Sequence, residues 1–432
     1  MLDIRFIREN VELIRKSLER RRDSQKLKEF GQLLALDEEL RVLRRRIQEL
    51  RTDRNKFSRE VGSLKKTGKD AAEIIERVNG INQRISETEA EASSLEEMMK
   101  RIQMSIPNVL HESVPFGKDE DDNEVVREWG GRPKPDFEIR SHVDLLELLD
   151  LADIPRAAKI SGARFYFLKN ELVMLDLAMQ RLALDMLIKK GYTPVYPPFM
   201  MRREPYEGVT DLADFEDVMY KIDDEDLYLI ATSEHPMAAM HMGEVFEPTD
   251  LPLKLAGIST CFRKEAGTHG KDTKGIFRVH QFNKIEQFVF SHPDESWKIH
   301  EDLISNIEEY FQALEIPYRI VNVCTGDIGI VAAKKYDLET WMPVQETYME
   351  RGSCSNCTAY QATRLNIKYR LKKGGTEKDY LHTLNSTMMA NPRAMVAILE
   401  NFQQEDGSVR IPKALHKYLP AGMKQIVPKK KT

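Results

Sequence analysis

Charged side chains of both signs gather around a single aromatic ring between residues 258 and 290. Two strand-like runs, 258–267 and 276–290, flank a segment rich in Gly and Lys, which predicts a β-hairpin. Because side chains alternate between the faces of a strand, Arg263 and Glu265 are expected on one face of the first strand. The same alternation predicts one charged face on the second strand, made of Arg278, His280, Phe282, Lys284 and Glu286.

This set of side chains has the chemistry to bind a nucleoside triphosphate beside an amino acid. Arginine guanidinium groups hold phosphate and carboxylate groups with paired donors. An aromatic ring can stack on a base, and carboxylates accept hydrogen bonds from an amine, an ammonium or a hydroxyl group. The alternative is an exposed sheet face covered with salt bridges, and the spacing alone leaves both interpretations open.

Polar residues also stand near the ends of three other runs. Thr232 and Glu234 lie two residues apart after an apolar run, and Glu350 with Ser353 offers oxygen ligands for a metal ion and a phosphate. Arg393 lies where a strand-like run turns into a helix, and helix N-termini bind phosphate. The chain contains neither G-x-G-x-x-G nor G-x-x-x-x-G-K-[ST], so a Rossmann or P-loop nucleotide site is not expected.

A zinc site is a further possibility, because Cys354 and Cys357 have the spacing of a ligand pair. There is no second pair, and Cys261 and Cys324 lack the spacing of ligands. Buried thiols are therefore the expected state of these cysteines, and no zinc is expected.

The elements that would position these residues begin with a long helical hairpin. Apolar residues recur at alternating steps of four and three over 36–64 and again over 74–102, with Arg54 as the one charged exception. This period predicts a coiled-coil seam, and the short polar break at 65–69 requires the two helices to pair antiparallel. Pro107 ends the second helix.

Basic residues concentrate on the first helix of this hairpin and its tip, whereas glutamates dominate the second helix. One interpretation is that the basic helix follows a phosphate backbone. The other is a solvated coiled-coil exterior with ion pairs within and between the helices. The candidate phosphate contacts are Arg44, Arg45, Arg51, Arg59 and Lys65.

The whole chain of 432 residues is long enough for two or three domains. We expect an N-terminal domain at 1–106 with an arm at about 27–105, a linker rich in Pro, Gly and acids at 107–140, and an α+β domain at 141–432. Its sheet is expected to be antiparallel or mixed and flanked by helices. The net charge of −5 does not indicate a nucleic-acid binder by itself.

Four cysteines in such a chain do not make a disulfide framework, which favours a reducing compartment. The start of the chain carries charges where a signal peptide needs an apolar core, and no run approaches the ~18 apolar residues of a membrane helix. We therefore expect a cytoplasmic protein.

Three segments resemble the three motifs of the class II aminoacyl-tRNA synthetases: GYTPVYPPFM, CFRKEAG…GIFRVHQFNKIEQF and LNSTMMANPRAMVAILENF. ATSEHP and SCSNCTAYQATRLNIKYR resemble the seryl family within that class, and the resemblance covers nearly the whole chain. It implies an α+β fold with a coiled-coil arm and an antiparallel-sheet catalytic domain. It also implies a homodimer built through the first motif.

The activity that the resemblance implies is ATP-dependent ligation of serine to tRNA(Ser), and to tRNA(Sec) where it is present. Serine would displace pyrophosphate from ATP to give seryl-adenylate, and the terminal ribose hydroxyl of the tRNA would then take the acyl group. The implied substrates and cofactor are serine, ATP and Mg²⁺. The five basic residues of the arm would grip the long variable arm of the tRNA.

The resemblance also implies roles for single residues. Arg263 would contact the serine carboxylate and the α-phosphate, Arg393 would contact the γ-phosphate side, and both would be catalytic. Glu265 would read the adenine amine, Phe282 would stack on adenine, and Glu286 would accept the serine hydroxyl. The implied ATP-binding set is Arg263, Lys264, Glu265, Arg278, Val279, Phe282, Glu350, Arg351, Gly352, Ser353 and Arg393. The implied serine-binding set is Thr232, Ser233, Glu234, Arg263, Glu286, Asn385 and Thr387. Mg²⁺ would be held by Glu350 and Ser353.

Two places depart from the commoner bacterial pattern of the family. Arg351 and Gly352 stand where a small apolar residue and a serine are usual, and alternation would place Arg351 on the opposite, exposed face. Residues 386–390 replace Gly-Ser-Gly-Leu-Ala, although Thr387 keeps a hydroxyl group. A duplicate used in antibiotic resistance or secondary metabolism would retain every motif and stays open as an alternative. A non-catalytic coiled-coil scaffold is disfavoured, because Arg263 and Arg393 are retained.

Overall fold

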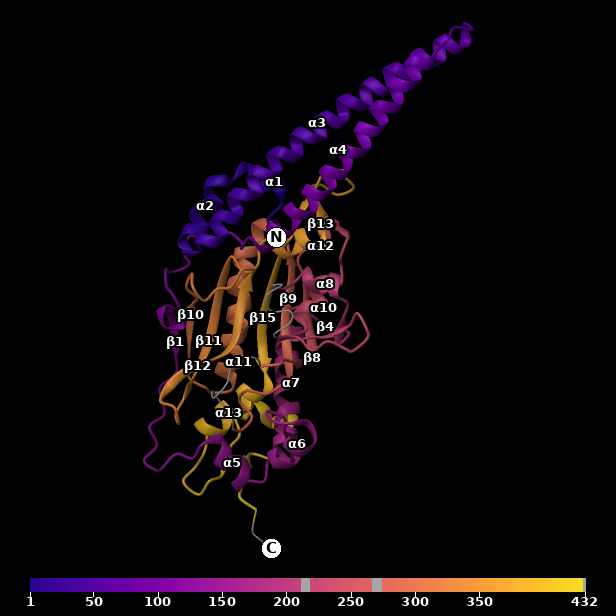
Figure 1. Ribbon diagram of the computed structural model, residues 1–432. Coiled ribbons are helices and arrows are strands. Elements are labelled where there is room, and N and C mark those ends of the chain that lie inside the picture. Colours follow the sequence, from indigo (N-terminus) through magenta and orange to yellow (C-terminus); the bar gives the residue numbers. More distant parts are fainter. Residues whose placement is uncertain (211–217, 266–273, 430–432) are drawn as a thin grey trace. The chain divides into compact units, whose positions relative to one another are not determined.

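The computed structural model describes residues 1–210, 218–265 and 274–429, which form two compact units, Met1–Pro107 and Asn108–Thr432 (Figure 1). The segment 266–273, which contains most of the expected hairpin loop, lies outside the described residues. No helix in the described part of the chain combines the length and hydropathy needed to cross a bilayer.

The first unit is entirely helical. Two short helices precede two long ones, and the long pair lies antiparallel, which confirms the predicted hairpin (Figure 1). The Asp23 side chain accepts a hydrogen bond from the Lys26 N–H and caps the first long helix, and the second ends two residues before Pro107. The helices are α1 Ile4–Glu9, α2 Val11–Arg20, α3 Ser24–Lys66 and α4 Ala72–Ser105.

The seam between α3 and α4 is the core of the arm. The positions predicted by the heptad spacing are buried in the middle of both helices, and the predicted apolar positions toward the helix ends are half-buried. Thr88 is a polar member of the seam, and its hydroxyl is satisfied by donating to the Arg84 carbonyl oxygen at 2.7 Å. The half-buried Phe57 is covered by the Arg77 guanidinium, 4.2 Å from the ring centre. The buried seam residues are Leu40, Leu43, Ile47, Leu50, Ile81, Ile85, Thr88 and Ala92.

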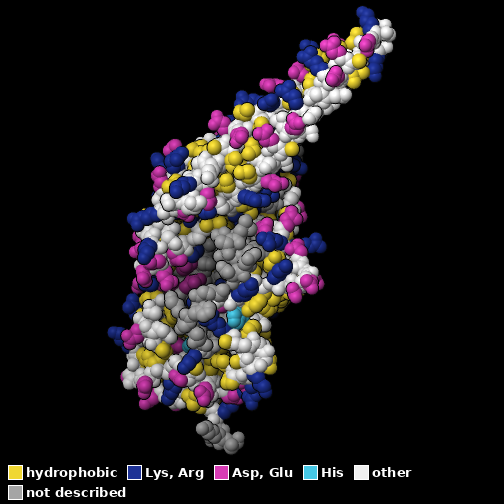
Figure 2. Space-filling view, in the orientation of Figure 1, with side chains coloured by type: hydrophobic (Ala, Val, Ile, Leu, Met, Phe, Trp, Pro, Cys, Tyr) yellow, Lys and Arg dark blue, Asp and Glu magenta, His cyan; other side chains and the backbone are white. Residues whose placement is uncertain are grey.

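Charges of both signs are interleaved on the outside of the arm (Figure 2). Arg44 pairs with Glu96 at 2.9 Å and Arg51 pairs with Glu89 at 2.7 Å, so each pair joins the two helices. All four side chains are largely solvent-exposed, so each pair contributes little to stability.

The second unit is built on an eight-stranded sheet in the order β1-β10-β11-β12-β15-β9-β8-β4. All neighbours are antiparallel except β4 and β8, which confirms the predicted antiparallel sheet. The strands are β1 Glu124–Trp129, β4 Thr193–Val195, β8 Leu253–Phe262, β9 Gln281–Ser291, β10 Tyr318–Asn322, β11 Lys334–Met342, β12 Thr347–Asn356 and β15 His382–Ala390.

Helices α7, α11 and α13 pack against the sheet and share its largest hydrophobic cluster. The central strands β9 and β15 are buried along most of their length, because side chains on both of their faces are covered. The helices are α5 His142–Leu148, α6 Ile154–Ser161, α7 Asn170–Lys189, α8 Arg203–Glu207, α10 Glu234–Ala239, α11 Ser296–Ala313, α12 Tyr360–Leu365 and α13 Asn391–Asn401.

Short strands and single turns of 3₁₀ helix complete the unit. The remaining strands are β2 Ala152–Asp153, β3 Phe167–Leu168, β5 Met200–Met201, β6 Tyr228–Leu229, β7 Val245–Phe246, β13 Lys368–Arg370, β14 Lys378–Tyr380, β16 Val409–Arg410 and β17 Gln425–Ile426. The 3₁₀ turns are η1 Glu120–Asp122, η2 Pro248–Asp250, η3 Pro293–Glu295 and η4 Lys413–Tyr418.

Two segments differ from the expected element boundaries. The segment 107–140 was expected as a surface connection, yet it contributes β1, an exposed edge strand paired with β10. The expected hairpin strands 258–267 and 276–290 form at β8 and β9, so each begins or ends about five residues away from the expected limits. Residues 276–280, which include Phe277 and Arg278, therefore lie in irregular backbone before β9.

Candidate active site

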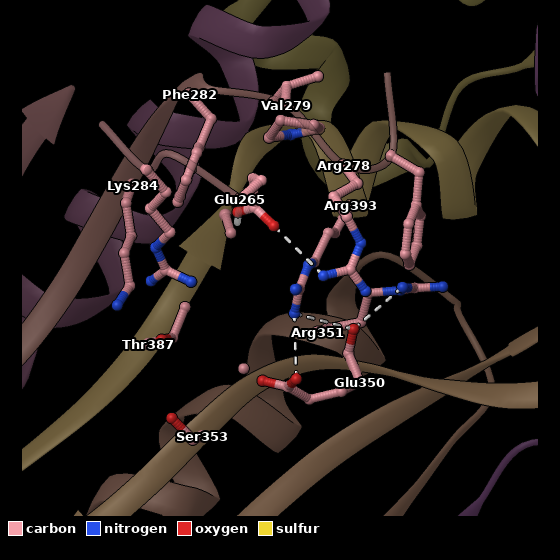
Figure 3. A pocket seen from close by; sticks show the side chains of 15 residues that line it. Glu265, Arg278, Val279, Phe282, Lys284, Glu350, Arg351, Ser353, Thr387 and Arg393 are labelled. Atoms are coloured by element: carbon pink, nitrogen blue, oxygen red, sulfur yellow. Dashed lines mark hydrogen bonds and ion pairs between the residues drawn. The ribbon is translucent and has the colours of Figure 1, made fainter. Parts of the chain in front are cut away.

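A cavity of about 120 Å³ opens among the ends of β8, β9, β12 and β15 (Figure 3). Some lining side chains project from these strands, which hold them in place. Residues 263–265 and 277–279 reach the cavity from irregular backbone. The lining residues are Arg263, Glu265, Phe277, Arg278, Val279, Phe282, Lys284, Glu350, Arg351, Gly352, Ser353, Thr387, Ala390, Pro392 and Arg393.

One side of the cavity carries a carboxylate, two guanidinium groups and a phenyl ring. Arg278 Nη1 lies 3.3 Å from Glu265 Oε2 (Figure 3). The guanidinium of Arg263 lies 5.2 Å from the centre of the Phe282 ring. Glu265 adopts the left-handed backbone region, with φ at 51°, which turns the chain just beyond β8. The four predicted residues therefore meet in one cavity, although only Phe282 is on a strand.

The other side of the cavity carries an ion pair between β12 and α13. Arg393 Nη1 lies 3.2 Å from Glu350 Oε2, and Arg393 is in the first turn of α13 (Figure 3). Burial would raise the pKa of Glu350, but Arg393 first and then Lys335 and Arg263 outweigh it and hold the pKa below its usual value. Glu350 is therefore charged at neutral pH.

Arg351 is buried, and the expectation that it would be exposed on the opposite face is wrong. In the register of β11 with β12, Gly352 faces Leu338 and Glu350 faces Glu339, so Arg351 is the extra residue of a β-bulge. Its Nε donates to Thr340 Oγ1 at 2.6 Å. Burial and the neighbouring Arg393 lower the pKa of Arg351 to about 9.

A second cavity of about 330 Å³ adjoins the first and shares Ser353 with it. Glu234 and Asn385 line it, and Asn385 Nδ2 donates to Glu234 Oε1 at 3.0 Å. Gln361 Nε2 donates to the same oxygen, also at 3.0 Å. Burial, with the Glu286 carboxylate adding to it, raises the pKa of Glu234 to about 7.

Lys284 of β9 lines the first cavity and contacts the segment that leads into α10. Lys284 Nζ donates to Thr232 Oγ1 at 3.1 Å and forms an ion pair with the Glu286 carboxylate. Burial raises the pKa of Glu286, and the lysine opposes that effect. Thr232 Oγ1 also accepts the Glu234 N–H at 3.2 Å, so these four residues form one continuous network.

Four predicted site residues line neither cavity, namely Thr232, Ser233, Lys264 and Glu286, and His280 also departs from its expected place. Lys264 is not a lining residue of the first cavity, and its backbone N–H donates to the Val218 carbonyl oxygen at 2.9 Å. Ser233 is fully buried and lines neither cavity. His280 does not share the charged face, because its Nδ1 lies 2.8 Å from the Arg263 carbonyl oxygen.

The four cysteines are buried free thiols. Burial raises the pKa of both Cys354 and Cys357, so neither is a thiolate at neutral pH. Cys357 Sγ accepts from Asn385 Nδ2 at 3.7 Å, and Cys354 Sγ donates to the His300 carbonyl oxygen at 3.7 Å. Within the described residues, no cluster of three or more His, Cys, Asp or Glu could hold a metal ion.

Sequence reasoning missed three contributors to the site. Phe277 lies near two guanidinium groups, those of Arg351 and Arg393, at 5.2 and 5.8 Å from its ring centre. Gln361 reaches Glu234 from α12, and no local pattern indicated it. Lys284 was placed on the charged face but given no role, although its position between Phe282 and Glu286 was the available signal.

Comparisons with known proteins agree over both units. The seryl-tRNA synthetase N-terminal domain matches residues 1–110, and the tRNA synthetase class II core domain (G, H, P, S and T) matches residues 218–402. The serine–tRNA ligase of Methanocella arvoryzae is 56% identical over 419 residues, which is 97% of this chain and 99% of that protein. The serine–tRNA ligase of Pyrococcus horikoshii is 53% identical over 451 residues, which is 100% of this chain and 98% of that protein.

Two solved structures resemble the chain over its whole length. The crystal structure of seryl-tRNA synthetase from Pyrococcus horikoshii complexed with ATP has a TM-score of 0.95 and 52% identity, with 100% of both chains covered. The cytoplasmic serine–tRNA ligase from Naegleria fowleri in complex with AMP has a TM-score of 0.89 and 38% identity, covering 100% of this chain and 99% of that one.

Proposed function

Because the chain belongs to the seryl-tRNA synthetase family and is a serine–tRNA ligase, we propose that the cavity of Figure 3 is where it activates serine with ATP. The observation that carries this assignment is the meeting of Arg263, Glu265, Phe282 and Arg393 around one space. The relatives are named as serine–tRNA ligases, and this supports the main assignment but not the alternative of a duplicate used in resistance or secondary metabolism.

The charges and the aromatic ring that line the cavity support nucleotide binding there. The Phe282 ring offers a face for adenine, and the Glu265 carboxylate accepts a hydrogen bond from the exocyclic amine. Arg263 and Arg393 then lie toward the phosphates, where their guanidinium groups neutralise charge that develops as pyrophosphate leaves. Arg393 is paired with Glu350 in this structure, so phosphate binding exchanges one anionic partner for another.

The serine side lies where the two cavities approach each other. We assign the ammonium of serine to Glu234 and Thr232, and its carboxylate to Arg263. The buried Glu286 would accept the serine hydroxyl, with the Thr387 side chain beside it. Alanine offers no hydroxyl to that carboxylate, and such a mismatch discriminates strongly between substrates. In-line attack then requires only that the bound serine carboxylate faces the α-phosphate.

The donor set of β11 and β12 suits Mg²⁺. Glu350 and Ser353 line the cavity, and Asp337 faces Ser353 in the strand register. Asp337 Oδ1 has no hydrogen-bond partner within the described residues, and burial, partly opposed by Lys335, raises its pKa to about 8. Carboxylate and hydroxyl oxygens are the ligands that Mg²⁺ prefers. A bound Mg²⁺ would neutralise phosphate charge and orient the polyphosphate.

We further propose that the arm binds the tRNA through its basic helix. Arg44 and Arg51 are already paired with glutamates of α4, whereas Arg59 and Lys65 are exposed and make no ion pair within the described residues. A phosphate backbone would therefore gain most from Arg59 and Lys65, because neither must first leave an acidic partner.

The chain is proposed to act as a homodimer in the cytoplasm, where tRNA is charged for translation. One face of α7 exposes Val173, Leu177 and Ile188, and the first class motif adds exposed Tyr196 and Met200. Exposed apolar side chains that cluster in this way mark an association surface. Equilibrium sedimentation of the wild type should give a dimer, and Leu177→Glu should weaken it.

The activation site is tested by amino-acid-dependent pyrophosphate exchange. Wild-type protein should exchange with serine alone among the twenty amino acids, and purified tRNA(Ser) should then accept the serine. Arg263→Ala should abolish exchange and leave tRNA affinity nearly unchanged. Arg156→Ala is a matched control, because Arg156 is exposed on α6 and pairs with Asp153, its one ionic partner among the described residues. Exchange at the wild-type rate in Arg263→Ala would overturn the assignment.

A further inference from the structure

Lys284 is a buried lysine inside the proposed serine pocket, and no role has been assigned to it above. Its side chain is 8% exposed, and its ammonium contacts the Glu286 carboxylate and the Thr232 hydroxyl. Burial of a lysine is unfavourable unless its charge is paired, so a position that only filled space would be better occupied by an apolar residue. The charge itself therefore needs a function at this position.

Titratable groups surround the Lys284 ammonium on every element packed against it. Glu234 and His235 come from α10, Cys261 from β8, Arg263 from the segment after β8, and Glu286 from β9 itself. His235 and Cys261 are neutral, because burial lowers the pKa of the histidine to about 3 and raises the pKa of the thiol. The charged set is therefore two carboxylates and two cations.

The two carboxylates do not behave as independent acids. Burial raises the pKa of Glu234 and of Glu286, and the Glu286 carboxylate raises the pKa of Glu234 further. Lys284 and Arg263 oppose both shifts. The carboxylate of an incoming serine would engage Arg263, which would leave Lys284 as the cation that keeps Glu286 ionised.

We propose that Lys284 is a positioning residue of the serine pocket, whose ammonium keeps the Glu286 carboxylate charged and aimed at the serine hydroxyl. Glu234 is then left to pair with the serine ammonium, and the Thr232 hydroxyl is held by the Lys284 ammonium and the Glu234 N–H. This inference rests on the proposed function, because it takes Glu286 as the acceptor of the serine hydroxyl. Lys284 itself need not touch the reacting atoms.

The test compares Lys284→Met and Lys284→Arg with the wild type in serine-dependent pyrophosphate exchange between pH 6 and 8.5. Loss of the ammonium raises the pKa of both carboxyl groups, so the acidic limb of serine kcat/KM should move up by about one pH unit or more. A shift of one pH unit corresponds to roughly a tenfold lower serine kcat/KM at the lowest pH values. The loss should appear in the serine KM more than in the ATP KM. Lys284→Arg keeps the charge and should restore most of the limb.

Lys298→Met is the matched control, because it removes an exposed lysine on α11 that pairs with Asp302. Its pH profile should follow the wild type. If Lys284→Met fails to fold, as thermal unfolding would reveal, Lys284→Gln carries the test with a neutral polar side chain. A folded neutral variant whose acidic limb and serine KM match the wild type would overturn the proposal.

Glu286→Gln separates this proposal from the one on which it rests. If that variant keeps the wild-type serine KM and specificity, Glu286 is not the hydroxyl acceptor and the proposed pocket fails. If Glu286→Gln loses serine activation while the neutral Lys284 variants do not shift the pH profile, only the role of Lys284 fails.

Discussion

Gly352 approaches β15 so closely that a single methyl group should reach the serine pocket. A β-carbon at this position would lie 2.8 Å from Thr387 Cβ and 3.1 Å from both Thr387 Cγ2 and the Thr387 carbonyl oxygen. The pairing of β12 with β15 ends at Cys354 and Ser386, two residues from Gly352 and one from Thr387, and Thr387 is also held by its pairing with Glu286 on β9. Neither strand can easily move away.

The Gly352→Ala variant should therefore be overpacked. Such a substitution in a packed sheet costs about 1–3 kcal/mol. If the displacement falls on the Thr387 side chain, that cost appears in serine binding, where each ~1.4 kcal/mol is a factor of ten. We expect serine kcat/KM to fall roughly 5- to 150-fold, with a smaller change for ATP.

The assay is serine-dependent pyrophosphate exchange at saturating ATP, together with thermal unfolding. Gly80→Ala in α4 is the matched control, because its β-carbon would meet nothing within 4 Å. That control should stabilise the helix by about 0.5–1 kcal/mol and leave serine activation unchanged. Wild-type serine kinetics and an unchanged Tm in Gly352→Ala would refute the packing argument.

Three further results are expected. Replacing Arg59 and Lys65 together by Gln should weaken tRNA binding several-fold at low salt and should lower the salt dependence of binding by about two phosphate contacts. Arg51→Gln should weaken binding less. Equal losses of affinity in a filter-binding assay would contradict this expectation. The pKa of Glu234 is about 7, and its ionised form is proposed to pair with the serine ammonium. The serine KM should therefore rise as the pH falls below 7, by up to tenfold per pH unit. A serine KM that stays constant from pH 5.5 to 7.5 would exclude Glu234 as the partner of the ammonium. Glu350→Gln should raise the Mg²⁺ concentration for half-maximal exchange about tenfold or more, and an unchanged Mg²⁺ titration would remove Glu350 from the metal site.

The helical arm could be predicted in detail because its signal is local. Each seam position repeats within a single helix, and the turn between the helices is too short to allow any other pairing. The observed helices, Ser24–Lys66 and Ala72–Ser105, end beside the polar break and before Pro107, as the sequence indicates. The ion pairs that cross the hairpin, such as Arg51 with Glu89, depend on which faces meet and needed the structure.

The site could be predicted by composition better than by geometry. Strand alternation placed Phe282, Lys284 and Glu286 on β9 correctly, but Arg278 reaches the cavity from irregular backbone that alternation does not describe. Arg351 was misplaced because a bulge depends on pairing with β11, a strand that is distant in the sequence. Such effects of partner strands are invisible in a single strand's pattern.

The closed seam of the arm limits how its length can change. Since α3 and α4 bury each other along matching heptads, an insertion in one helix alone would rotate the facing residues out of contact. Equal additions of seven residues to both helices would keep every knob facing its hole and would lengthen the hairpin by about 10 Å. The length of the arm can therefore change only in steps of one heptad in each helix. Homologues whose arms reach over tRNAs of different size should differ by whole heptads added to both helices.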